Sequence, residues 1–257
     1  MKYLKIEWLK LKSYNTFWIL LGLYVVTQTL VFYGMDSFKF TFSGEEDGMG
    51  MDFKYLRIFS FPNIWHYFSY MAGFFKIILA VLLILLMNNE FEYKTYRQHI
   101  IDGLSRTENF MLKVGTMLTI SAFATLILFA EVLIFGKESE GISFFQQSDF
   151  ALAFFLEVLG FLSFAFFLTH FIKRTAYVVV VLLIYMIAIE PMLGYKISEI
   201  KDHLPLQVFR SMISIPFTQQ FGASVQESVP VWHMVKSLTY STILVLIAYV
   251  YNLRRDQ

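Results

Sequence analysis

The sequence contains no cysteine, so no disulfide bond can hold any of its loops together. Charged residues are also scarce, at 16% of the chain, whereas about a quarter of a soluble domain is charged. Hydrophobic residues reach 57% and aromatic residues 19%, which predicts a polytopic membrane protein. The formal net charge of +1 gives no bulk attraction for nucleic acid, which we therefore exclude as a partner.

Motifs that carry catalysis or nucleotide binding are missing as well. No G-x-x-x-x-G-K-[ST] pattern occurs, so the chain cannot cradle a nucleotide in a P-loop of its own. No H-E-x-x-H pattern occurs, and the five histidines lie in different segments. The Glu45-Glu46 pair lies in a predicted loop and lacks the partner residues of an intramembrane protease. We therefore expect no enzymatic activity, no metal site and no cofactor bound by this chain.

Six apolar runs are each about the 20 residues that cross the hydrocarbon core of a bilayer. They predict an all-α polytopic membrane protein with six transmembrane helices: Phe17–Tyr33, Trp65–Met87, Phe110–Phe135, Phe150–Phe171, Thr175–Leu193 and Val235–Tyr251. No small-residue cleavage pattern follows the first run, so we expect no signal peptide. The whole chain, residues 1–257, is then a single transmembrane domain.

The segments outside these runs differ in character. Residues 1–16 place Trp8 and two leucines on one helical face and the lysines largely elsewhere, which predicts an amphipathic helix in the membrane interface. A solvated basic tail is the alternative. Residues 34–65 carry glycines and acidic residues and are predicted to form a loop. Residues 194–233 contain three prolines but are too apolar for a free loop, so we expect short helices packed on, or dipping into, the outer membrane face.

The orientation follows from the distribution of lysine and arginine, which favour the cytoplasmic side. With the N-terminus inside, 12 of the 21 basic residues fall in the shorter segments that this topology makes cytoplasmic. These are Lys2, Lys5, Lys10, Lys12, Lys94, Arg97, Arg106, Lys113, Lys173, Arg174, Arg254 and Arg255. We therefore expect a multi-pass protein of the cell membrane with both termini in the cytoplasm.

The polar stretch 88–110, between the second and third runs, has a helical pattern of its own. Its apolar residues recur at spacings of three and four, which predicts one apolar stripe on a short helix. These residues are Tyr93, Tyr96, Ile100 and Leu104. Gly103 can take the left-handed conformation that ends a helix, and Ser105 with Glu108 has the spacing of a capping box that begins the next one. Such a segment is suited to docking a partner at the membrane surface, and an ordinary interfacial helix is the alternative.

With this topology, the polar stretch resembles the ABC-2 family of ABC-transporter permeases. The resemblance lies in the pattern E-x-E-x-x-T-x-R, followed by G-L-S-R and then K. The matching residues are Glu90, Glu92, Thr95, Arg97, Gly103, Leu104, Ser105, Arg106 and Lys113. Lys94 departs from the pattern, because a glycine is more usual there. The six spans and the N-terminal interfacial helix extend the resemblance over essentially the whole chain.

The resemblance implies one permease of an exporter, paired with a second permease, either an identical copy or a related chain, and with two copies of a separate ATPase subunit. ATP and Mg²⁺ would be bound by that ATPase, and the cargo would be an amphiphile such as a peptide antibiotic, a drug, a lipid or a glycan intermediate. In this family the short helix after the second span fits a groove on the ATPase. Its apolar face would consist of Tyr93, Tyr96 and Ile100. Its charged rim would consist of Glu92, Arg97 and Arg106.

Several polar residues fall inside the predicted spans, where a charge is costly unless it is paired or hydrated. Those at greatest depth are Thr27, Gln28, Thr29, Lys76 and Glu157. Counted at about 1.5 Å per residue, they fall in the outer half of the bilayer. This predicts one polar layer there, which faces a cavity between two permease copies or packs within one copy. Lys76 and Glu157 either pair directly or contact cargo. Glu131 and Glu190 fall near span ends, where we expect them to reach water.

A protein that works without ATP is the alternative function. It would be an ion-coupled carrier or channel that uses the charges inside the spans, Lys76, Glu131 and Glu157, or it would be a membrane scaffold.

Overall fold

The computed structural model describes residues 12, 14–37, 39–40, 51–52, 58–92, 103, 105–137, 141, 143–216 and 226–254. Within these residues six helical segments are long and apolar enough to cross a membrane, as predicted. They lie within α2 (Asn15–Ser37), α3 with α4 (Ile64–Ala72 and Lys76–Glu92), α6 (Arg106–Phe135), α7 (Asp149–Phe171), α8 with α9 (Thr175–Ile184 and Glu190–Lys196) and α11 (Val231–Arg254).

Helix α6 extends beyond the predicted apolar run because capping, and not hydropathy, sets where it begins. The third run was predicted from Phe110, but α6 begins at Arg106. The hydroxyl of Ser105 accepts the backbone N–H of Glu108, and the Glu108 carboxylate accepts the backbone N–H of Ser105 at 2.8 Å. The predicted capping box is therefore present. Gly103 has a φ of 98°, the left-handed conformation expected at this position.

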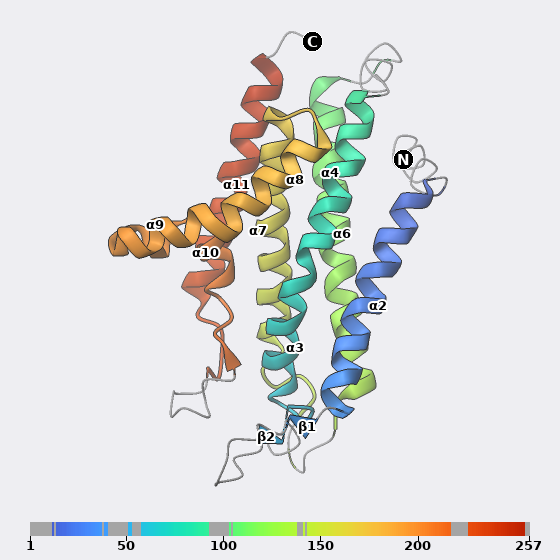
Figure 1. Ribbon diagram of the computed structural model, residues 1–257, viewed down its shortest axis with the longest axis vertical. Coiled ribbons are helices and arrows are strands. Elements are labelled where there is room, and N and C mark those ends of the chain that lie inside the picture. The colour runs from blue at the N-terminus through green and yellow to red at the C-terminus, as the bar shows by residue number, and fades with distance from the viewer. Residues whose placement is uncertain are drawn as a thin grey trace.

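Helix α7 is the centre of the bundle (Figure 1). It packs against α3, α4, α6, α8, α10 and α11, and most of its residues are buried. Its sequence is apolar around almost the whole circumference, which is typical of a helix covered on all sides. Large side chains such as Phe154, Phe161 and Phe166 fill the space between it and its neighbours.

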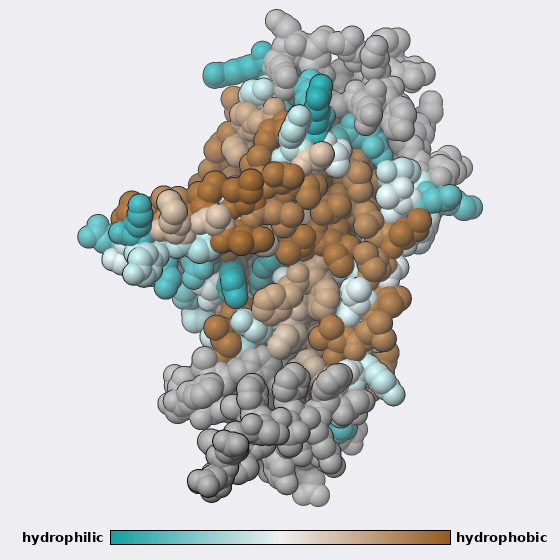
Figure 2. Space-filling view, in the orientation of Figure 1, coloured by the Kyte–Doolittle hydropathy of each residue, from teal (hydrophilic) through white to brown (hydrophobic). Residues whose placement is uncertain are grey.

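The fifth candidate span does not run parallel to the others. Through α8, a π-helical turn η3 (Tyr185–Ile189) and α9, it runs obliquely and projects from the side of the bundle (Figure 1). Residues 195–203, at its projecting end, are all exposed. Polar surface marks this end in Figure 2, next to the apolar surface of the rest of the segment.

The chain then folds back against the bundle through η4 (Ser198–His203) and α10 (Pro205–Arg210). Helix α10 packs on α7 and α11. Its Phe209 lies against Gly160, at the midpoint of α7, where an added Cβ would come within 2.2 Å of the ring. The short helices expected over 194–233 are thus present, and α10 reaches the middle of the bundle instead of resting on its end.

Two further predictions concern segments outside the long helices. The loop predicted over 34–65 is shorter than expected, because residues 34–37 belong to α2 and residues 64–65 to α3. Its described part contains an antiparallel strand pair, β1 (Lys39–Phe40) with β2 (Met51–Asp52). The interfacial helix predicted over 1–16 lies largely outside the described residues.

Gly160→Ala should destabilise the protein by about 1–3 kcal/mol, because its methyl group would overlap Phe209 and push α10 away from α7. The measurement is thermal unfolding of the purified protein in detergent. Gly115→Ala is the matched control: it lies in α6, has open space at its Cβ position, and should be neutral or slightly stabilising.

Adding Phe209→Leu to Gly160→Ala should recover part of the lost stability, because the smaller side chain makes room for the methyl group. An unchanged melting temperature for Gly160→Ala alone would contradict this packing.

Candidate functional site

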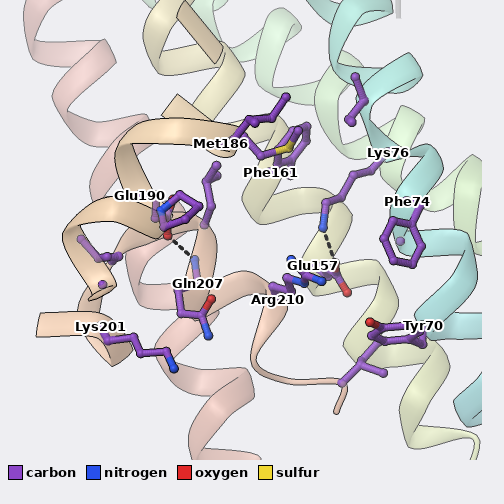
Figure 3. Close-up of a pocket in the computed structure, with 18 of the residues that line it drawn as sticks. Tyr70, Phe74, Lys76, Glu157, Phe161, Met186, Glu190, Lys201, Gln207 and Arg210 are labelled. Carbon is purple, nitrogen blue, oxygen red and sulfur yellow. Dashed lines mark hydrogen bonds and ion pairs between the residues drawn. The ribbon is translucent and has the colours of Figure 1, made fainter. Parts of the chain in front are cut away.

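A cavity of about 680 Å³ lies between α3 and α4, the central α7, and the segment from η3 to α10 (Figure 3). Part of its wall is apolar, and includes Phe74, Ile77, Phe161 and Met186. The rest is polar, and its charged residues are Lys76, Glu157, Glu190, Lys201 and Arg210. A volume of this size lies in the range of pockets that bind small molecules.

Two interruptions in helix geometry border the cavity. A 3₁₀ turn η2 (Gly73–Phe75) separates α3 from α4, and the π-helical turn η3 precedes α9. The sequence explains the second, because Pro191 follows it and a proline ring clashes with the carbonyl four residues earlier in a regular α-helix. Such turns inside longer helices often mark functional sites. Here they place Lys76 and Glu190 on opposite sides of one cavity.

Lys76 and Glu157 form an ion pair in the cavity wall, with the lysine Nζ donating to the glutamate Oε1. Their side chains are only 12% and 5% exposed. The Lys76 ammonium also lies 5.3 Å from the centroid of the Phe161 ring, in a cation–π contact. Gly73 leaves room for the carboxylate, because a Cβ at this position would lie 3.1 Å from Glu157 Oε1. The structure therefore brings together the two charges that the sequence placed deepest in the spans.

Glu190 does not reach water, so our expectation for it was wrong. Its exposed fraction is 6%, because η4 and α10 fold back over it. One carboxylate oxygen accepts the backbone N–H of Gln207, in the first turn of α10. The first N–H groups of a helix lack partners within the helix and carry a partial positive charge, so Glu190 caps α10. Its other oxygen, Oε2, is buried without a hydrogen-bond partner in the described part of the chain.

Lys201 and Arg210 also line the cavity, and the sequence analysis did not anticipate them. Both side chains are exposed, and neither has a hydrogen-bond or ion-pair partner among the residues that the structure describes. They come from η4 and α10, and Figure 3 shows Lys201 and Gln207 below Phe161 and Met186, with Arg210 between them and Glu157 in this view. Only the fold-back of the chain brings them there, and no local sequence pattern signals it.

A second buried polar group lies between α2 and α6. Glu131 is 2% exposed and accepts hydrogen bonds from the side chains of Gln28 and Thr29, the latter at 2.9 Å. Our expectation that Glu131 reaches water was therefore wrong, because α2 packs over it. Thr27 instead donates to the carbonyl of Leu23, one turn earlier in its own helix. The polar residues of the predicted layer therefore form two separate groups. Gln28 and Thr29 bind Glu131, and Lys76 pairs with Glu157 at the cavity.

The residues predicted to dock an ATPase are described only at the two ends of their segment. At one end, Lys113 Nζ donates to Glu90 Oε1 and so ties α6 to α4. At the other, Arg106 donates to the carbonyl of Leu253 in α11 at 3.5 Å. Outside the described residues lie Tyr93, Thr95, Tyr96, Arg97, Ile100, Leu104 and the side chain of Glu92.

Three buried asparagines, Asn88, Asn109 and Asn252, lie at the same end of these helices. They were not anticipated, because only charged residues and one polar cluster in the first span had been weighed. The side-chain amides of Asn88 and Asn109 have no hydrogen-bond partner in the described ranges.

Neither the models of known protein families nor the curated proteins include a match to this sequence. Over the described residues, no group of three or more histidine, aspartate or glutamate side chains is arranged to hold a metal ion. The candidate site is therefore described from the structure alone, as an amphipathic cavity inside a bundle of candidate membrane spans.

Lys76→Met and Glu157→Gln should each lower the stability by about 3 kcal/mol, because each leaves the other group of a largely buried pair without its partner. The double variant should lose less stability than the two single variants lose together. Thermal unfolding of all four proteins in the same detergent measures this coupling. Strictly additive losses would show that the two groups do not interact.

Proposed function

We propose that the chain is the membrane-spanning permease subunit of an ATP-binding cassette exporter, which moves an amphiphilic compound out of the cell. A separate ATPase subunit would supply the energy by hydrolysing Mg-ATP. The observation that carries the proposal is the amphipathic cavity, whose wall offers both apolar and charged groups between candidate membrane spans. The resemblance of the 90–113 pattern to ABC-2 permeases supports the choice of an ATP-driven mechanism.

Helix α4 offers a mechanical connection between the proposed docking segment and the cavity. Its 17 residues run without interruption from Lys76, in the cavity wall, to Glu92, within the proposed docking segment 88–110. Such a helix is about 25 Å long. The Glu90–Lys113 ion pair joins its end to α6, whose own start is fixed by the capping box. We infer that a displacement of the docking segment by the ATPase would move α4 and reshape the cavity.

A second permease copy is inferred from the projecting end of the oblique helix. This end lies near the middle height of the bundle and exposes Lys196, Glu199, Lys201 and Asp202 (Figures 1 and 2). Charged side chains in the hydrocarbon core are costly unless they face protein or water. A second copy that covers this end, with water between the two subunits, would remove the cost.

An ion-coupled carrier remains the second candidate, and one observation favours it. Glu131 is a buried carboxylate held by two polar side chains inside the spans, the kind of group that binds protons or cations in such carriers. Transport that continues without any ATPase, driven by an ion gradient, would select this function.

Both termini and the docking segment are proposed to lie in the cytoplasm. In support, α2 begins, α4 ends, α6 begins and α11 ends at the same end of the bundle (Figure 1).

A cysteine introduced at Gly48 or Ser224 should react with a membrane-impermeant thiol reagent added to intact cells, and one at Gln98 should not. The native chain has no cysteine, so every label reports the introduced position. All three should react after the cells are permeabilised. Labelling of position 98 in intact cells would reverse the orientation and remove the basis for docking a cytoplasmic ATPase.

Tyr96→Asp or Ile100→Asp should abolish copurification of the ATPase, because a charge would enter the proposed apolar contact. Loss of one such anchor typically costs about 2 kcal/mol or more. Phe145→Asp, at an exposed position in the loop between α6 and α7, is the matched control and should leave copurification intact. Normal expression and melting temperature must accompany the loss. Full copurification with both docking variants, or no ATPase with the wild-type chain, would refute the proposal.

A further inference from the structure

We propose that the cavity binds an anionic amphiphile, with a phosphate or carboxylate held by Lys201 and Arg210 and a neighbouring N–H or O–H donated to Glu190. The inference deepens the proposed function, because it specifies the class of cargo. Only the statement that the bound molecule is cargo rests on the proposed function. The binding itself is a property of this chain alone.

The charges of the cavity wall do not balance within the protein. Glu157 is neutralised by Lys76, and Glu190 accepts a hydrogen bond from the first turn of α10. Both carboxylates are therefore already engaged. Lys201 and Arg210 keep their positive charges without an acidic partner in the part of the chain that the structure describes. An acidic group is the ligand chemistry that compensates two such cations, and arginine can bind it through two parallel hydrogen bonds.

The second part of the head group is specified by Glu190. This side chain lines the cavity, is 6% exposed, and leaves Oε2 buried without a hydrogen-bond partner among the described residues. A buried acceptor without a donor is costly, so the site is completed by a molecule that brings one. The head group therefore needs a hydroxyl, amide or ammonium hydrogen close to its acidic group.

The remainder of the cavity suits an apolar body. Its volume of about 680 Å³ is much larger than one phosphate or carboxylate requires. Figure 3 shows Phe161 and Met186 above Lys201 and Gln207 in the cavity wall. A molecule with its acidic group toward η4 and α10 would thus extend its hydrocarbon part along the apolar wall. This polarity favours an amphiphile over a small inorganic anion.

The test is a binding titration of the isolated chain in a neutral detergent, followed by native mass spectrometry. The probes are dihexanoyl phosphatidylglycerol, with a phosphate and hydroxyl donors, and N-lauroylglycine, with a carboxylate and an amide N–H. Dihexanoylglycerol lacks the charge, and dihexanoyl phosphatidylmethanol keeps the negative charge but lacks the donor. The two anionic probes with donors should bind at least about tenfold more tightly than either comparison compound, as expected for charge-assisted hydrogen bonds.

Lys201→Gln and Arg210→Gln should each weaken binding of the two anionic probes about tenfold and leave dihexanoylglycerol unaffected. Lys196→Gln is the matched control, because it removes the same charge from the adjacent α9 without touching the cavity. If Arg210→Gln does not fold, Arg210→Lys together with Lys201→Gln provides the comparison. The stronger of the two anionic probes distinguishes a phosphate-bearing lipid from a carboxylate-bearing acyl peptide.

The inference is overturned if dihexanoylglycerol binds as tightly as the anionic probes, or if Lys196→Gln weakens binding as much as the cavity variants. No ATPase is present in this titration. Binding of the expected pattern by a chain that copurifies with no ATPase would therefore refute the proposed transporter class while upholding the site. Copurification of the ATPase without anionic selectivity would do the reverse.

Discussion

The ion pair between Lys76 and Glu157 is the contact on which the rest of the arrangement depends. Glu157 lies in α7, which touches most of the other helices, and Lys76 begins α4 directly after the 3₁₀ turn. An unpaired charge of either sign at this depth would be costly, so the pair fixes the second span against the central helix. Gly73 supports the same contact by leaving space for the carboxylate. The two charges thereby cancel at the centre of the bundle, while their polar atoms still form part of the cavity wall.

The fold-back of η4 and α10 creates the other half of the cavity wall. Non-helical backbone at membrane depth is tolerated only where it is buried in protein or lines water, because its polar groups need partners. Glu190 supplies one partner by capping α10, and the close contact of Phe209 with Gly160 holds the helix against α7. The same carboxylate therefore serves the fold through one oxygen, while the other is buried beside the cavity without a hydrogen-bond partner among the described residues.

Features encoded locally could be predicted from the sequence, and features that depend on distant packing could not. The six apolar runs, the left-handed Gly103 and the Ser105 capping box need only neighbouring residues, and all are present. The burial of Glu131 depends on α2, whose Gln28 lies 103 residues earlier in the chain. The burial of Glu190 depends on the fold-back of the chain through η4 to α10. Counting along a span anticipates neither and so placed both wrongly in water. Lys201 and Arg210 were missed for the same reason. The ATPase-docking helix stays a prediction.

The π-helical turn at 185–189 also affects how this chain would align with any homologous sequence. A π-helical turn holds one residue more than an α-helical turn, and one residue of an α-helix corresponds to a rotation of about 100°. A relative with one residue fewer in this turn could continue as a regular helix, but the residue equivalent to Glu190 would point away from α10. A single-codon insertion or deletion is therefore enough to create or remove the capped fold-back. An alignment without a gap at this turn would conceal that difference.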